Sequence, residues 1–548
     1  GIQVWLPPRD WNPAGDYGVE PTLVERINFD NIVMDRIHYN PLMVRVFESA
    51  EEGCEAIRDL SFANLTCRSC GWPELIGRPG RPLADFRFAN CRFFRSDAND
   101  VRAPWDVRKT PAVTNRTVAY APADCRGFVF EGCEFRENGT PVACPDGAAS
   151  ALPPLFGDGI RDDTAAIQAR LDTGASCIYL PPPAKEYLVS KTLRIGSDQE
   201  LRLDRYTRVR LAPKSNCPLV ANRDWKNGNR NVAVTGGVWD FDNRSQYPAL
   251  WLEQHVGKPY ATTQALPAAA ERPGKDCHGF GMDFRRVNGF ALRSVTLRNP
   301  TTFGFRGERV SNFTVDDVTF DYETVNPVRA CMDGIHFDGG SHHGRVTNLR
   351  GACWDDLLAF NSNDTDHTDA EGEPITDIVV DGIQSVGCHS AVRLLSTGGD
   401  VRNITIRNVH GTFYRYAVGL THFFAWTDRP RGRFDNITIA DCSVAKCVQP
   451  PNCVAKLSPM GLVHIEGRLD IGSVKIENLT RVEDAVPDVP TIDVRPVATI
   501  ENLVIRDCTQ VNRTKTPMTF FRNAGKIKTL VKENIRDEVS LMGGSPVQ

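Results

Sequence analysis

Two stretches, Asn403-Ile404-Thr405-Ile406 and Asn436-Ile437-Thr438-Ile439, decide the fold of this 548-residue chain. Each joins a turn-forming asparagine to a short strand in which apolar and polar residues alternate, as in a strand buried on one face. Similar segments recur through the second half of the chain: Phe313-Thr314-Val315, Gly344-Arg345-Val346-Thr347, Ile378-Val379-Val380, Val474-Lys475-Ile476 and Leu503-Val504-Ile505. The pattern predicts a repeat protein built from strands.

The spacing of these strands indicates which repeat it is. They follow one another after 24 residues (Val380 to Ile404), 33 (to Ile437), 37 (to Val474) and 29 (to Leu503). The connections show no helical period, whereas a βαβ fold needs an amphipathic helix of about 10–15 residues between strands. We therefore predict a right-handed parallel β-helix, an all-β solenoid whose stacked rungs bury an apolar core and leave an outer face for a polysaccharide.

A repeat of the same kind precedes this region. Each repeat consists of an aromatic residue, a turn-forming residue and a short alternating strand: Phe29-Asp30-Asn31-Ile32-Val33, Phe62-Ala63-Asn64-Leu65-Thr66-Cys67, Phe88-Ala89-Asn90-Cys91-Arg92-Phe93 and Phe130-Glu131-Gly132-Cys133-Glu134-Phe135. We predict an N-terminal β-rich, solenoid-like region over residues 1–150, with a structural or substrate-positioning role, and a catalytic β-helix over residues 151–548. Asp162 or Asp163 is expected to cap a short helix that runs to Leu171.

Composition narrows the class of partner. The formal net charge is −4, which gives no case for binding nucleic acid or a membrane surface. No apolar run approaches the roughly 18 residues of a membrane-spanning helix. The 17 cysteines are an odd number, so not all can pair within the chain, and we expect mostly small buried thiols. Residues 242–285 interrupt the repeat and are expected to wall one side of a groove.

Three acidic residues are the strongest candidates for chemistry. Asp333 lies in Cys331-Met332-Asp333-Gly334, and Asp355 and Asp356 are adjacent in Cys353-Trp354-Asp355-Asp356. The offset from Asp333 to Asp356 is 23 residues, within the roughly 20–30 residues of one solenoid turn. The three acids should therefore gather at one spot. Crowded carboxylates favour a shared proton, which acid/base cleavage of a glycosidic bond requires.

The alternation of the two strands supports this alignment. If Ile335 and Phe337 point into the core, Leu358 and Phe360 should stack on them, and Asp333 then lies beside Asp356 at the bend that enters each strand. A lone aspartate at such a bend is commonly a turn former that bonds its own backbone. Three acids converging on neighbouring rungs favour a site instead.

At these residues the chain resembles the polygalacturonase-like glycoside hydrolases of family 28, within the pectin-lyase-like β-helix superfamily. The family's pattern runs Asn-Thr-Asp-Gly, Gly-Asp-Asp, Gly-His-Gly and Arg-Ile-Lys, and the first three are matched in order and in part by Cys331-Met332-Asp333-Gly334, Trp354-Asp355-Asp356 and Cys388-His389-Ser390. The likeness covers roughly residues 157–510.

This resemblance implies a secreted or periplasmic enzyme that hydrolyses a pectin-like or related glycan with inversion and without a metal or other cofactor. Asp355 would protonate the leaving oxygen, while Asp333 and Asp356 would hold and activate the water. The oligomeric state is left open.

Four further residues are candidate substrate contacts. His389 either orients the acid or bonds a sugar hydroxyl, and Arg393 either clamps the substrate or pairs with an aspartate. His336 shares the outward face of the Asp333 strand, and Trp354 is a candidate to stack on a sugar face. Where the family has Arg-Ile-Lys, the chain has Arg415-Tyr416-Ala417-Val418-Gly419-Leu420-Thr421-His422, so neutral sugars remain open.

Two other functions remain open at this point. A β-helix polysaccharide lyase shares the scaffold but typically relies on Ca²⁺ and a basic residue near a uronate. A non-catalytic glycan-binding solenoid would use the three acids only as turn residues. Unsaturated products would indicate the lyase, and binding without cleavage would indicate the binding protein.

Overall fold

The structure, a computed structural model, describes residues 2–6, 22–37, 40–46, 54–78, 80–99, 119–120, 125–142, 152–246, 279–323, 331–363, 368–423, 425, 427–450 and 460–539. The chain divides into two compact units, one of Gly1–Leu155 with Ala165–Pro182 and one of Phe156–Thr164 with Pro183–Gln548. Most of the segment expected to wall a groove, residues 247–278, lies outside the described residues. None of the described helices has the length and apolar character that crossing a bilayer requires.

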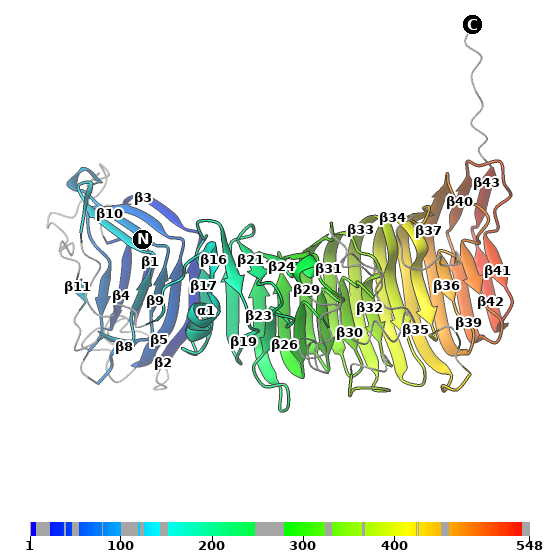
Figure 1. Cartoon of the computed structure of the whole chain (residues 1–548), viewed down its shortest axis with the longest axis horizontal. Coiled ribbons are helices and arrows are strands. Elements are labelled where there is room, and N and C mark those ends of the chain that lie inside the picture. Colours follow the sequence, from blue (N-terminus) through cyan, green and yellow to red (C-terminus); the bar gives the residue numbers. More distant parts are fainter. Residues whose placement is uncertain are drawn as a thin grey trace, which may run out of the picture. The chain divides into compact units, whose positions relative to one another are not determined.

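The first unit is a short parallel β-helix, as predicted (Figure 1). Its described strands are β1 (Ile2–Leu6), β2 (Thr22–Asp30), β3 (Val33–Ile37), β4 (Leu42–Val46), β5 (Cys54–Ala63), β6 (Thr66–Ser69), β7 (Glu74–Ile76), β8 (Leu83–Ala84), β9 (Arg87–Ala89), β10 (Arg92–Arg95), β11 (Ala119–Tyr120), β12 (Cys125–Arg126), β13 (Val129–Glu131), β14 (Glu134–Glu137) and β15 (Thr140–Pro141). The unit also takes most of helix α1 (Thr164–Leu171) and strand β17 (Cys177–Leu180).

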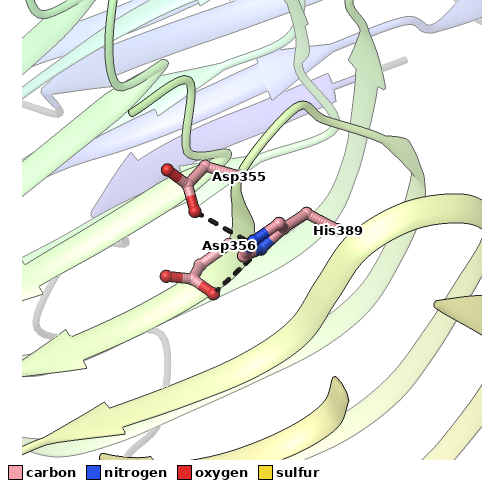
Figure 2. A group of neighbouring side chains, drawn as sticks. All are labelled: Asp355, Asp356 and His389. Carbon is pink, nitrogen blue, oxygen red and sulfur yellow. Dashed lines mark ion pairs between the residues drawn. The ribbon is translucent and has the colours of Figure 1, made fainter. Parts of the chain in front are cut away.

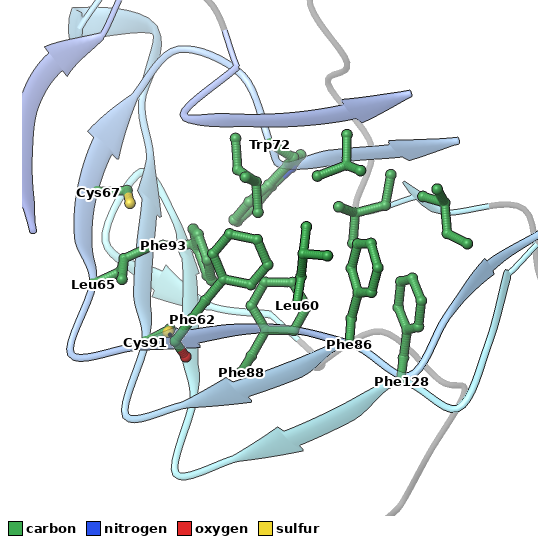
Figure 3. Packing of buried hydrophobic residues seen from close by; sticks show 14 of the residues in the cluster. Leu60, Phe62, Leu65, Cys67, Trp72, Phe86, Phe88, Cys91, Phe93 and Phe128 are labelled. Carbon is green, nitrogen blue, oxygen red and sulfur yellow. Dashed lines mark hydrogen bonds between the residues drawn. The ribbon is translucent and has the colours of Figure 1, made fainter. Parts of the chain in front are cut away.

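A column of phenylalanines holds these rungs together. Phe29, Phe62, Phe88 and Phe130 are successive partners on parallel strands, and their rings stack at centroid distances of 5.0, 4.8 and 4.7 Å. Figure 3 shows Phe62 and Phe88 inside the apolar cluster of this unit. The aromatic repeat therefore marks one core position per rung, because residues in register on parallel strands share a face.

The second unit is the longer parallel β-helix (Figure 1). Its described strands are β16 (Asp158–Asp162), β18 (Glu186–Val189), β19 (Leu193–Ile195), β20 (Gln199–Leu203), β21 (Arg208–Leu211), β22 (Val220–Asn222), β23 (Asn229–Thr235), β24 (Val238–Asp240), β25 (Met282–Arg285), β26 (Val287–Arg293), β27 (Thr296–Arg298), β28 (Phe305–Glu308), β29 (Ser311–Asp321), β30 (Ile335–Asp338), β31 (His342–Ala352), β32 (Asp356–Asn361), β33 (Ile375–Leu395), β34 (Asp400–Thr421), β35 (Gly432–Lys446), β36 (Val463–Ile465), β37 (Leu469–Glu483), β38 (Ile492–Val494), β39 (Thr499–Arg506), β40 (Thr509–Asn512), β41 (Phe521–Asn523), β42 (Lys526–Glu533) and β43 (Arg536–Val539). The predicted cap of α1 is confirmed, since Asp162 Oδ1 accepts the Thr164 backbone N–H at 2.9 Å.

The register confirms three of the four predicted spacings. Ile404 pairs with Ile437, Ile437 with Val474, and Val474 with Leu503. The first spacing was wrong: Ile404 pairs with Ile378 rather than with Val380, so this rung is 26 residues long and not 24. The apolar run at 378–380 offers two inward positions of the same type, and alternation alone does not distinguish a slip of two residues.

The asparagines that precede the strands build a ladder along one corner of the helix. Asn403 and Asn436 have left-handed backbones, with φ of 56° and 51°, and Asn436 Nδ2 donates to Asn403 Oδ1 at 2.9 Å. Asn403 in turn donates to Asp377 Oδ1 at 2.7 Å. Asparagine is favoured here because it tolerates positive φ and bonds to its neighbour in the next rung.

Replacing Asn436 by alanine is expected to lower the free energy of unfolding by about 1–2 kcal/mol, because alanine pays the left-handed backbone cost. Asn436→Gly relieves that backbone cost and should recover most of the loss. Denaturant titration followed by circular dichroism measures both variants. Equal losses in the two would show that the side-chain ladder, and not the backbone, carries the effect.

Candidate active site

The three acids lie at the start of two neighbouring rungs. Ile335 pairs with Leu358 and Phe337 with Phe360 across β30 and β32, which confirms the predicted stacking and the offset of 23 residues. The Gly334 backbone N–H, next to Asp333, donates to the Asp356 carbonyl at 2.9 Å. The apolar pairs fix the register, and the register places the acids side by side.

Asp356 is a buried, ionised carboxylate. Its Oδ1 accepts hydrogen bonds from Ser390 Oγ and, at 3.2 Å, from Tyr416 Oη. Arg393 Nη1 lies 3.5 Å from its Oδ2. Burial opposes the charge, but His389, Arg393 and Ser390 outweigh it and hold the pKa of Asp356 well below its usual range. At neutral pH this group is therefore ionised.

The pKa of Asp355 is shifted in the other direction. About 25% of its side chain is exposed, and its Oδ1 lies 3.3 Å from His389 Nδ1. Its Oδ2 accepts the Cys331 backbone N–H at 2.9 Å. Burial raises the pKa of Asp355, and the charge of Asp356 adds to the rise, against the opposing charges of His389 and Arg393. Asp355 and Asp356 thus have pKa values shifted in opposite directions, the usual arrangement of an acid and a base.

His389 joins these two aspartates, as Figure 2 shows. Its Nδ1 lies 3.3 Å from Asp355 Oδ1 and 3.7 Å from Asp356 Oδ1. Burial opposes the charge on the ring, and the two carboxylates overcome it and raise the pKa of His389. The three residues also offer ligand atoms that all lie within 4.8 Å of one another, a spacing that a divalent cation can bridge. In this structure those atoms pair with each other.

Asp333 and His336 form a second, deeper pair. Asp333 Oδ2 lies 2.7 Å from His336 Nδ1, and the side chains are 5% and 1% exposed. Burial raises the pKa of Asp333 to about 8, and the charges of Asp355 and Asp356 add to the rise while His336 opposes it. The structure thus places His336 inside the protein, where the sequence analysis expected a residue open to sugar.

Arginines supply positive charge at the site. Arg393 Nε donates to Thr421 Oγ1 at 3.1 Å, and its guanidinium lies over the ring of Phe423 at 5.1 Å from the centroid. Arg415 is 6% exposed, burial lowers its pKa, and it is close enough to Asp355 for their charges to interact. The chain lacks the Arg-Ile-Lys motif, yet the fold brings two arginines to the acids.

The aromatic side chains at the site pack against neighbouring residues of the site. Trp354 is half-buried and donates through its indole N–H to the Tyr322 carbonyl at 3.2 Å. The Tyr414 and Tyr416 rings meet the His389 ring edge to face, at 5.2 and 6.1 Å. The roles of Ser390 and Tyr416 were missed in the sequence, and the register could have found them, because Asp356, Ser390 and Tyr416 are successive partners.

Comparisons with known proteins agree on the fold. No protein family and no curated protein matches the sequence. The structure is similar to an exopolygalacturonase from Thermotoga maritima, at 17% identity over 69% of this chain and 90% of that chain, with a TM-score of 0.51. It is also similar to a family 28 exopolygalacturonase from Yersinia enterocolitica (17% identity, 74% and 81% covered, TM-score 0.48) and to PfbA, a surface adhesin of Streptococcus pneumoniae (13%, 72% and 95%, 0.44).

The likeness to the Thermotoga maritima enzyme confirms, at the level of the parallel β-helix fold, the resemblance to polygalacturonases seen in the sequence. A shared fold does not by itself assign an activity. The activity depends on the residues of the site.

Proposed function

We propose that the protein is a secreted or periplasmic glycoside hydrolase that cleaves a pectin-type glycan without a metal. The observation that carries this proposal is the pair of neighbouring carboxyls whose pKa values are shifted apart, raised at Asp355 and lowered at Asp356. Asp355 is also the most exposed acid of the three. It is therefore the one that a substrate oxygen can reach.

In the proposed reaction Asp355 donates its proton to the glycosidic oxygen as that bond breaks. Asp356 takes a proton from a water molecule, which Asp333 helps to hold, and the resulting oxygen attacks the anomeric carbon. Attack from the face opposite the leaving group inverts the configuration of that carbon. His389 lies against both carboxyls and keeps them oriented, and its charge is balanced by that of Asp356.

The separation of the carboxyls gives a second candidate mechanism. Asp355 and Asp356 offer oxygens within 4.8 Å of each other, whereas inverting enzymes typically separate their two carboxyl groups by roughly 6.5–9.5 Å and retaining enzymes by about 5–5.5 Å. In a retaining reaction Asp356 would attack the anomeric carbon itself and form a glycosyl-enzyme. We favour inversion because the resemblance to family 28 implies it, with the water placed by Asp333.

Incubation with a panel of acidic and neutral polysaccharides tests the activity. We expect new reducing ends on a uronate-containing glycan and, in proton NMR of the first product, the inverted anomer. The retained anomer would replace inversion by the double displacement at Asp356. Unsaturated, ultraviolet-absorbing products would indicate a lyase instead, and glycan binding without any cleavage would contradict the hydrolase.

Arg393 and Arg415 favour an acidic sugar. Arg393 pairs in register with Ala359 and Gly419 on its neighbouring rungs, so small residues flank it on both sides. Arg393→Gln should raise the KM for de-esterified polygalacturonate by about tenfold or more, the size of a lost hydrogen bond to a charged group.

Methyl-esterified substrate serves as the comparison, since its carboxyl carries no charge, and its KM should change little. Arg345→Gln, whose side chain is 57% exposed on another strand, is the matched control. Equal losses on both substrates would show that Arg393 acts only through its ion pair with Asp356.

A further inference from the structure

Behind the three acids lies a fully buried chain of charged side chains. His336 Nδ1 faces Asp333 at 2.7 Å, and its Nε2 faces Asp338 Oδ1 at 3.3 Å. Arg306 Nε donates to Asp338 Oδ2 at 2.6 Å. His336 and Arg306 are neighbours in register on β30 and β28. The chain Asp333–His336–Asp338–Arg306 therefore runs from the candidate site into the protein.

The ring of His336 is packed against neighbouring side chains. It stacks on the ring of Phe303 with 4.1 Å between centroids and 5° between planes, and Asn361 Nδ2 lies 3.4 Å from Nε2. Each ring nitrogen faces a carboxylate oxygen, and two carboxylates favour the charged form of the ring. Burial opposes this charge, but Asp333 and Asp338 outweigh it and raise the pKa of His336 to about 10.

We propose that His336 is a positioning residue that fixes the Asp333 carboxyl beside the attacking water. It also limits how far burial raises the pKa of Asp333. Asp338 and Arg306 in turn hold the ring in place and keep it charged. The role rests on the proposed hydrolase function, and it goes beyond it by naming the residue that governs Asp333.

The proposal explains why a deep carboxyl can act in the reaction. Asp333 is surrounded by groups that favour its neutral form, namely its buried setting and the charges of Asp355 and Asp356, while His336 is its opposing partner. Without that partner the carboxyl would stay protonated to a higher pH. A protonated Asp333 is a poorer acceptor for the water.

The test is the pH profile of kcat/KM in His336→Asn, which keeps a donor near the Nδ1 position but cannot carry the charge. The acid limb should move up by about one pH unit, because an opposite charge in contact shifts a carboxyl pKa by about that much or more. The rate should therefore fall about tenfold on the acid side and recover as the pH rises. A uniform loss at every pH would assign His336 a merely structural role.

Asp338→Asn is the second variant, in case His336→Asn fails to fold. Because Asp338 affects Asp333 only through the His336 ring, this substitution should shift the acid limb of the kcat/KM profile in the same direction by a smaller amount. The double variant should shift no further than His336→Asn alone. The exposed His410→Asn is the matched control, with no shift expected; shifts that simply add would overturn the proposal.

A readout without activity separates this inference from the proposed function. Among the 11 histidines, the NMR signal that disappears in His336→Asn should not titrate between about pH 5.5 and 7 in the wild-type protein, below the pKa of about 8 of its partner Asp333, and it should titrate there in Asp333→Asn. If this result is obtained with a protein that cleaves no glycan, the interaction between Asp333 and His336 is supported and the proposed hydrolase function is contradicted. An active enzyme whose His336 titrates normally overturns the inference alone.

Discussion

Replacing Asp355 by asparagine should lower kcat by about 10³-fold while the protein folds normally. General acid catalysis contributes roughly 10²–10⁴-fold, and the amide cannot give a proton to the leaving oxygen. The change keeps the size of the side chain and its acceptor for the Cys331 N–H. Steady-state rates on the glycan that the wild-type protein cleaves measure the loss of kcat, and circular dichroism tests whether the variant folds normally.

An activated substrate sharpens the test of this role. An aryl glycoside with a good leaving group needs little protonation, so Asp355→Asn should lose far less activity on it than on the polysaccharide. The alkaline limb of the wild-type profile should also vanish in the variant, because activity needs Asp355 protonated and falls as the pH rises through its raised pKa. Asp507→Asn, at an exposed left-handed turn, is the control. Near-wild-type turnover on the polysaccharide would remove Asp355 as the acid.

The second large effect is expected at Arg306, whose replacement by methionine should lower the free energy of unfolding by about 3–5 kcal/mol. The guanidinium is 0% exposed and meets three carboxylates, Asp338 at 2.6 Å, Glu308 at 2.6 Å and Asp283 at 3.2 Å. These attractions outweigh the cost of burial and raise the pKa of Arg306. Its loss leaves buried negative charges without their common partner.

Denaturant titration of Arg306→Met against the exposed Arg345→Met measures this effect, and the control should change by no more than about 0.5 kcal/mol. Adding Glu308→Gln to Arg306→Met should recover part of the loss, because one uncompensated charge is removed. A loss below about 1 kcal/mol for Arg306→Met, with no recovery in the double variant, would mean that water reaches the cluster.

Much of the fold could be predicted because it depends on local pattern. The alternation at Ile404 and Ile437 and the phenylalanine of each N-terminal rung report which side chains face the core. The offset of 23 residues between Asp333 and Asp356 followed from the same reasoning. The misplaced rung at Ile378 shows its limit, since a slip of two residues keeps the same face inward.

The site was harder to predict from the sequence, because the residues that contact one another there come from different rungs, and the connections between these rungs differ in length. Ser390 and Tyr416 reach Asp356 from the next two rungs, and Arg306 lies 32 positions before the Asp338 that it binds. Nothing near these residues in the chain marks them as partners. His336 sits at an outward position of its strand, yet neighbouring side chains cover it to 1% exposure.

By itself, the order of residues determined that this chain coils into stacked strands and that three aspartates meet on neighbouring coils, since strand faces and turn residues are set locally. Only the tertiary structure decided in which direction the pKa of each carboxyl is shifted. That choice depends on burial and on the distances to His389, Arg393 and His336, and electrostatic interactions act through space rather than along the chain.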